Sequence, residues 1–156
     1  MSLVASIFAS AQDQNAAKAD QEKLEQGLKT LFDSKIDMAI DNAVFSVNDG
    51  NSYVTEAEDA GIIGMIAPKS FEKMREDLEK KSEGILDKGE MTLDGQKVLF
   101  IKKSKEKDGK VFFITVYCKA NDAESSIMVT SFFEKGKDDI YKPHAEKAIA
   151  SAKLVK

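Results

Sequence analysis

Three apolar runs separated by polar turns lie between residues 90 and 134, and their pattern predicts a β-sheet. The first run, Val98–Ile101, has four consecutive apolar residues, so both faces of this strand should be covered, because successive side chains of a strand point to opposite sides. The runs at 111–118 and 126–133 are rich in β-branched and aromatic residues, which fit a pleated sheet. Asp108-Gly109 lies between the first two runs, and Asp-Gly in that position is a strong hairpin signal. The pattern predicts an antiparallel meander.

A second Asp-Gly pair, Asp94-Gly95, separates Met91-Thr92-Leu93 from the first run and predicts a short preceding strand. Within the run at 111–118 every even position is apolar, whereas the odd positions are mixed. We therefore expect the even face to lie on the main core and the odd face to be partly covered. The even positions are Phe112, Ile114, Val116 and Cys118.

Three helices are predicted around this sheet. Asp13–Phe32 carries an apolar stripe at helical spacing, and Pro68 is well placed to open a second helix at Lys69–Ser82. Pro143 is expected to open the last helix, which would run to Leu154. Residues 35–47 fit a strand and a helix equally well. The inner face of the last helix should consist of Ala145, Ala148, Ile149 and Ala152.

The N-terminal stretch has the apolar and cleavage-site features of a signal peptide. Leu3–Phe8 is mostly apolar, and Ala9-Ser10-Ala11 has the small-residue spacing that a signal peptidase cuts after. No basic residue precedes the apolar stretch. We interpret residues 1–11 as a signal-peptide remnant, which predicts an exported, periplasmic or cell-envelope protein whose domain spans residues 12–156. In the alternative interpretation Leu3–Phe8 begins a native helix and the protein is cytoplasmic.

Composition narrows the function classes. A chain of 156 residues favours one domain, and a net charge of -4 argues against a dedicated nucleic-acid binder. No apolar run approaches the roughly 18 residues of a membrane span, so no transmembrane segment is predicted. The single cysteine, Cys118, and the single histidine, His144, cannot make a standard zinc site, and phosphate loops and nucleophile elbows are absent from the sequence. We predict no catalytic, metal or cofactor-binding residue.

Five lysines lie near the tip of the hairpin predicted at Asp108-Gly109, and this cluster has two possible interpretations. They could form a patch for an anionic lipid or polymer, or they could be solvated residues that protect a sheet edge. We favour the second interpretation, because Glu106 and Asp108 interrupt the cluster and it contains no arginine or aromatic residue. The lysines are Lys102, Lys103, Lys105, Lys107 and Lys110.

From Ile62 onward the chain resembles the fold family of the photosystem II subunit PsbP and of the nuclear import factor that binds the Ran GTPase. The resemblance rests on Gly64–Pro68, the Phe71–Leu78 helix, Met91–Lys97 and Ala148–Ala152. It implies an antiparallel sheet flanked by helices, with no shared active site. Bacterial members are often small exported proteins of unassigned function.

The sequence therefore predicts an α+β domain, a meander of about five or six strands flanked by helices in a sandwich-like arrangement. We expect a non-catalytic interaction module that binds an unknown protein partner. The alternative is a small carrier that holds an apolar ligand between a helix and the sheet. The pocket of that carrier would be lined by Phe71, Met74, Leu78, Phe113 and Met128.

Overall fold

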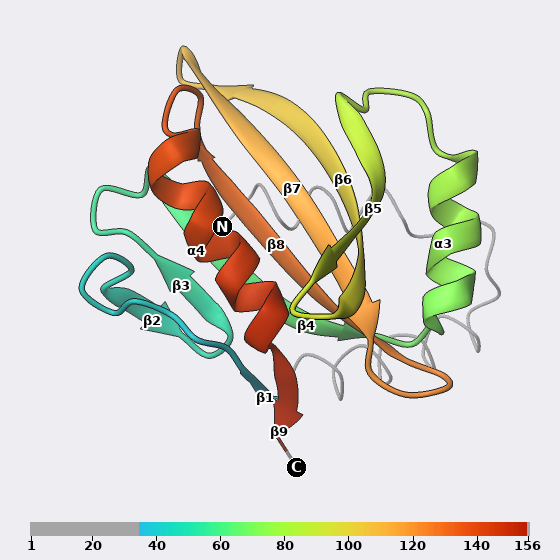
Figure 1. Cartoon of the computed structure of the whole chain (residues 1–156). Coiled ribbons are helices and arrows are strands. Elements are labelled where there is room, and N and C mark those ends of the chain that lie inside the picture. Colours follow the sequence, from blue (N-terminus) through green and yellow to red (C-terminus); the bar gives the residue numbers. More distant parts are fainter. Residues whose placement is uncertain (1–34, 156) are drawn as a thin grey trace, which may run out of the picture. The chain divides into compact units, whose positions relative to one another are not determined.

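The computed structural model describes residues 35–155, which form a seven-stranded antiparallel sheet with a helix on each side (Figure 1). The strand order is β2-β3-β4-β8-β7-β6-β5, and a separate two-stranded sheet pairs β1 with β9. The predictions for the remnant at 1–11 and for the helix at Asp13–Phe32 lie outside the described residues. The elements are β1 (Lys35–Asp37), β2 (Val47–Asp49), β3 (Ser52–Val54), β4 (Ala60–Ala67), α3 (Phe71–Lys80), β5 (Asp87–Leu93), β6 (Gln96–Lys107), β7 (Lys110–Ala120), β8 (Ser126–Glu134), α4 (Asp138–Ser151) and β9 (Lys153–Val155).

The predicted meander is confirmed as β5–β8, joined by the two predicted Asp-Gly turns. Both residues of each turn have positive φ: 49° and 76° at Asp94-Gly95, and 52° and 76° at Asp108-Gly109. Two consecutive positive φ values define a type I′ turn, whose twist matches that of the flanking strands. Glycine adopts this conformation without strain, which is why the sequence pattern marks the turns so clearly.

The sheet has seven strands, more than the five or six predicted, and residues 47–67 form β2, β3 and β4 beside the meander. β4 pairs with β8 over its whole length, from Ala60↔Phe133 to Ala67↔Ser126. It thus lies inside the sheet, between β3 and β8, although it precedes α3 and the meander in the chain. The α+β fold with a sheet flanked by helices is confirmed.

Both described helices have bounds that differ from the predicted ones. α3 is shorter than predicted and begins after Ser70, whose hydroxyl accepts a hydrogen bond from the Lys73 amide at 3.3 Å. α4 begins at Asp138, and Pro143 lies inside it rather than at its start. Asp138 and Asp139 place negative charge in the first turn, where the helix dipole favours it. α4 ends at Ser151 because Lys153–Val155 pairs with β1 instead of continuing the helix.

The main core lies between the sheet and α4. The predicted inner face of this helix is confirmed, since Ala145, Ala148 and Ile149 are buried and so is Ala152 just after its end. These alanines let the helix backbone approach the sheet closely. Gly64 in β4 makes room for the segment around β1, because a Cβ at this position would lie 3.0 Å from Met38 Cε and 3.3 Å from Ile36 Cβ. The buried residues of this main core include Ile36, Phe45, Ile62, Val98, Tyr117, Val129 and Phe133.

This arrangement corrects our assignment of the main core to the even positions of β7. Tyr117, an odd position, belongs to the large cluster under α4, and its neighbours Thr115 and Lys119 are also buried. The even positions Phe112 and Ile114 are buried on the opposite face, while Val116 is only half-buried. The prediction failed because both faces of this strand are covered, so polarity did not identify the main core.

A lysine side chain contacts the C-terminal carbonyls of each described helix. Lys88 Nζ donates hydrogen bonds to the carbonyls of Leu78, Glu79 and Lys81 at the end of α3. Lys119 Nζ donates to the Ala150 carbonyl at 3.1 Å in the last turn of α4, and burial lowers the pKa of this lysine. Positive charge at a helix C-terminus is favourable, so these two lysines fix the helix ends against the sheet.

Candidate functional site

The side of the sheet that faces α3, named here the α3 face, has a regular arrangement of side chains. Cross-strand register places Met65, Met128, Cys118 and Leu99 in one row across β4, β8, β7 and β6. Directly opposite residues of neighbouring strands have adjacent side chains, so this row forms one continuous strip. The next row toward the β6–β7 turn consists of Ile63, Thr130, Val116 and Ile101.

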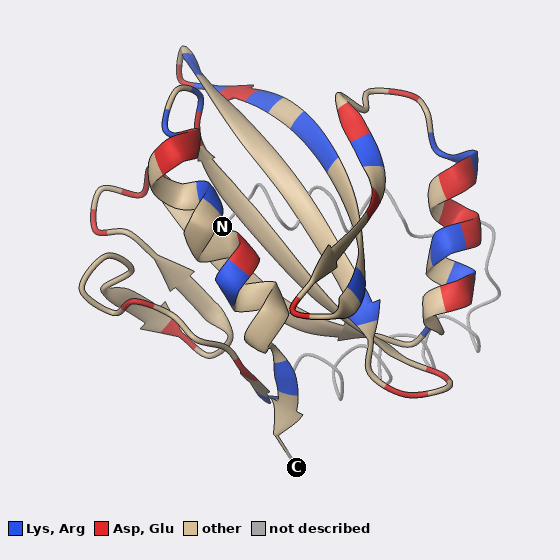
Figure 2. Cartoon of the chain, in the orientation of Figure 1, with Lys and Arg blue, Asp and Glu red and all other residues tan. Residues whose placement is uncertain are grey.

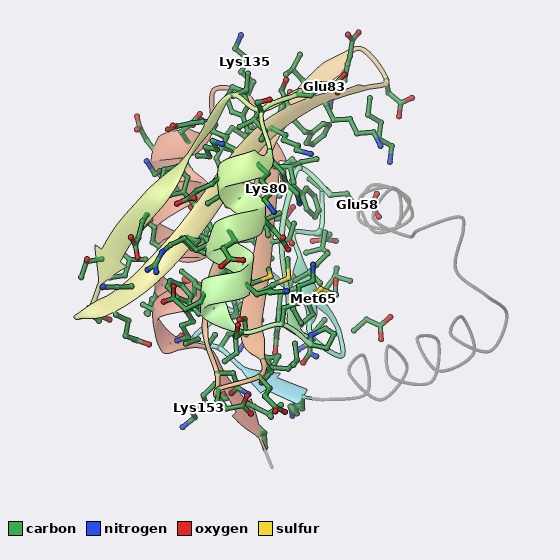
Figure 3. The ribbon with its side chains drawn as sticks, turned by 90° about the vertical axis from the view of Figure 1, so that its right-hand side faces the viewer. Glu58, Met65, Lys80, Glu83, Lys135 and Lys153 are labelled. Carbon is green, nitrogen blue, oxygen red and sulfur yellow. The ribbon has the colours of Figure 1, made fainter. Side chains whose placement is uncertain are left out.

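Polar contacts hold α3 over this face along its whole length (Figure 3). Ser126 Oγ donates to the Lys69 carbonyl at 2.7 Å just before the helix begins. Near the middle, the Arg75 guanidinium bonds the Glu90 carboxylate of β5 at 2.7 Å. Lys88 contacts the carbonyls at the far end. The position of α3 therefore depends on hydrogen bonds and one ion pair in addition to apolar packing.

The apolar residues of α3 are only partly covered. Phe71, Met74 and Leu78, named here the α3 strip, are half-buried, and no residue of this helix is buried. Val116 and Met128 on the sheet are also half-buried. The α3 strip and these two strand residues thus provide partly accessible apolar surface, and methionine side chains adapt readily to different neighbours.

The structure brings together only part of the predicted pocket. The α3 strip lies over the α3 face, and Met128 points to that same face of the sheet. Phe113 points to the opposite face, where its ring contacts Phe133 edge-on at 6.4 Å and packs against the core under α4. Its assignment to the pocket was wrong, because Phe113 and Met128 have opposite orientations in the register of β7 with β8.

Cys118 and His144 lie on opposite sides of the sheet. Cys118 is buried on the α3 face, beside Met128 and Leu99. His144 belongs to α4, where its ring contacts Phe45 edge-on at 5.4 Å. A nucleophilic thiol needs its base within hydrogen-bond reach, which this separation prevents.

The Cys118 thiol should react slowly with a thiol reagent in the folded protein and rapidly after unfolding. Burial raises its pKa to about 11, although a hydrogen bond with Ser126 acts in the opposite direction. The reactive thiolate is therefore scarce at neutral pH and poorly accessible. The measurement is labelling followed by mass spectrometry, with and without urea. Rapid labelling of the folded protein would contradict the burial of Cys118 and would indicate that its thiol is reactive.

Neither a metal-binding cluster nor a membrane-spanning helix is found within residues 35–155. No group of three or more histidine, cysteine, aspartate or glutamate residues in this range has the arrangement of a metal site. In the same part of the chain, no helix has the length and apolar character needed to cross a membrane.

A polar cluster surrounds Asp59, which immediately precedes β4. Its carboxylate accepts hydrogen bonds from Thr55 Oγ1 at 2.6 Å, from Lys137 Nζ at 2.7 Å and from the Tyr141 hydroxyl at 3.2 Å. Burial would raise the pKa of Asp59, but the hydrogen bonds from Lys137, Thr55 and Tyr141 lower it to about 2. Each member has its partner within the cluster, so we assign it to stability: it ties the β3–β4 turn to the start of α4.

Acidification should expose the contribution of Asp59 to stability. A carboxyl group with a lowered pKa stabilises the fold above its unfolded value of 3.8, and this contribution disappears as the pH falls through about 2. The expected loss is about 2 kcal/mol of unfolding free energy. Urea unfolding between pH 5 and pH 2 measures it, and Asp59→Asn should remove that part of the pH dependence. Equal pH slopes for the two proteins would contradict this assignment.

Comparisons with known proteins bear on the fold. No family model and no curated protein matches the chain. Among solved structures, a protein from Bacteroides thetaiotaomicron VPI-5482 is similar with a TM-score of 0.52 and 14% identity, covering 70% of this chain and 41% of the other. LpqN of Mycobacterium tuberculosis, involved in cell envelope biogenesis, is similar with a TM-score of 0.53 and 13% identity, covering 79% and 84%. CyanoP, the PsbP of Synechocystis sp. PCC 6803, has a TM-score of 0.44 and 7% identity, covering 78% and 93%.

These identities establish likeness of fold alone. The chain shares its fold with LpqN and with part of the longer Bacteroides protein, of which it covers less than half.

Proposed function

We propose that this protein is a non-catalytic binding module that works outside the cytoplasm, in the periplasm or cell envelope. Its binding surface is the α3 strip together with Val116 and Met128, and its partner is a protein. The module belongs among the PsbP-like proteins, in agreement with the resemblance of residues 62–156.

The observation that carries this proposal is the incomplete burial of α3. A surface helix normally buries its apolar stripe against the core, but Phe71, Met74 and Leu78 stay half-buried. Polar contacts at Lys69, Arg75 and Lys88 hold the helix in place. Accessible apolar surface rimmed by charged residues is a common feature of protein-binding sites.

Two features support a location outside the cytoplasm for this protein. The stretch Leu3–Phe8 followed by Ala9-Ser10-Ala11 has the pattern of a signal peptide. LpqN, whose fold is similar, is involved in cell envelope biogenesis. A cell-envelope location would place the α3 strip within reach of envelope proteins.

Affinity purification from the native envelope fraction tests the binding surface. Met74→Glu puts a charge into the α3 strip and should abolish recovery of the partner, because an unpaired charge in an apolar interface costs several kcal/mol. Glu76→Lys, an exposed change on the same helix, is the matched control and should leave recovery unchanged. Thermal unfolding of each variant verifies that it is folded. Equal recovery with wild type and with folded Met74→Glu would contradict the proposed surface.

The alternative function, a carrier of an apolar ligand, is favoured by the methionines near α3. Met65, Met74 and Met128 come from the sheet and the helix, and Figure 3 shows sulfur atoms close together beside Met65. Methionine fills irregular space and suits a variable ligand. Native mass spectrometry of protein purified from its host decides between the two. A stoichiometric small molecule that is lost in Met74→Glu would establish the carrier.

A further inference from the structure

The strand register separates the hairpin lysines into two groups. Lys102 pairs with Thr115 and faces α4, where its Nζ lies 4.2 Å from the centroid of the Phe113 ring and 3.7 Å from Asp138. The other four lysines point to the α3 face. We name these four residues the lysine face: Lys103, Lys105, Lys107 and Lys110.

In the same register, the side chain of Glu106 lies on the opposite face of β6 from these lysines. Glu106 pairs with Val111 and points to the α4 side, so it does not lie between the side chains of Lys105 and Lys107. Asp108 remains in the turn, and Glu134 lies beside Phe112, where its carboxylate is 3.6 Å from Lys137. The lysine face is thus more continuous than the order of residues along the chain indicates. Figure 2 shows blue segments along β6 toward its turn with β7, with a red segment among them near the turn.

Within residues 35–155 the lysine face has no ion-pair partner. Lys107 and Lys110 are exposed and stand directly opposite each other. Like charges in opposite positions destabilise a sheet, so the stability of the hairpin does not account for this pair. A partner that supplies several negative charges would account for it.

The surroundings of the lysine face indicate the class of partner. Lys103 and Lys105 are half-buried beside Ile114 and Phe112, which are buried, so their stems pack on apolar residues while their ammonium groups reach outward. Stacking on bases requires accessible aromatic rings, and Phe112 is covered. Clusters of about 4–8 lysines and arginines held at a membrane surface bind anionic lipids, and the four lysines here reach that size.

We propose that the lysine face binds the phosphate headgroups of an anionic lipid bilayer. This inference goes beyond the binding of a protein partner and does not depend on the α3 strip. Contact through the β6–β7 end of the α3 face would hold the module at a membrane surface. Each lysine near such a surface strengthens binding about five-fold, so the four together give a large, salt-sensitive effect.

Vesicle sedimentation in low-salt buffer tests the proposal with the full chain. Wild type should bind vesicles of equal parts phosphatidylglycerol and phosphatidylcholine and should dissociate from them at high salt. It should not bind vesicles of pure phosphatidylcholine. Lys107→Gln with Lys110→Gln should weaken binding about twenty-five-fold, from about five-fold per lysine. These two residues are exposed, so the double variant should fold normally, which circular dichroism verifies.

The matched control replaces two exposed lysines of α4, Lys142→Gln with Lys147→Gln, and changes net charge by the same amount. It should bind like wild type. An equal loss in the control, or no preference of wild type for the anionic vesicles, would overturn the proposal. Tighter binding to a single-stranded DNA oligonucleotide than to the vesicles would overturn it in favour of a nucleic acid. Met74→Glu should still bind vesicles, which separates this result from the test of the α3 strip.

Discussion

Replacing Phe45 with alanine should lower the free energy of unfolding by about 3–5 kcal/mol, the range for fully buried phenylalanine side chains. Phe45 is 1% exposed although it belongs to no helix or strand. Its ring contacts Tyr141 at 6.1 Å and His144 at 5.4 Å, both on α4. One aromatic side chain thus holds an irregular segment on the core, and its removal would leave a cavity beneath that segment.

Urea unfolding monitored by circular dichroism measures this loss. Ser46→Ala changes the exposed neighbour and should alter stability by less than about 0.5 kcal/mol. Phe45→Leu keeps most of the buried volume, so its loss of unfolding free energy should lie between those of Ser46→Ala and Phe45→Ala. A loss below about 1 kcal/mol for Phe45→Ala would contradict the burial of this ring.

Phe112→Ala should have an effect of similar size, about 3–5 kcal/mol, on the opposite side of the sheet. Phe112 is 8% exposed on the α3 face, between Lys105 of β6 and Glu134 of β8. Its ring supplies apolar contact for the stem of its lysine neighbour as well as for the sheet. Equilibrium unfolding in urea measures the effect, and Phe112→Leu should lose much less. A change under about 1 kcal/mol would show that this face is not a packed layer.

Local signals in the sequence predicted the meander and the inner face of α4. An Asp-Gly pair adopts a type I′ turn by its own conformational preference, so Asp94-Gly95 and Asp108-Gly109 could be located without knowledge of the rest of the fold. The alanines at 145, 148 and 152 mark a close helix–sheet contact through residue size alone. These features depend on neighbours in the sequence.

Sequence reasoning left β1 undecided and missed β2, each for its own physical reason. β1 is three residues long and exists because Ile36 pairs with Leu154, at the other end of the domain. β2 is exposed at every residue, so it has no apolar alternation to reveal it. Phe113 was assigned to the pocket because both faces of β7 carry apolar residues, and only the packing of α4 distinguishes them.

Most of the lysine face, in contrast, could have been predicted from the sequence. Lys103, Lys105 and Lys107 occupy alternate positions of one strand, and Glu106 occupies a position of the other parity. Applying the two-residue period of a strand to charged residues would have separated them. Lys110 could be added only from the hairpin register, which follows from the two-residue turn.

The location of the native protein tests the proposed exported module most directly, because every partner of the α3 strip depends on it. The measurement is fractionation of host cells that express the native gene, followed by N-terminal sequencing of the purified protein. We expect protein outside the cytoplasm with an N-terminus near Gln12, after cleavage behind Ala11. Protein that retains residues 1–11 and stays in the cytosolic fraction would contradict it and would place the partners inside the cell.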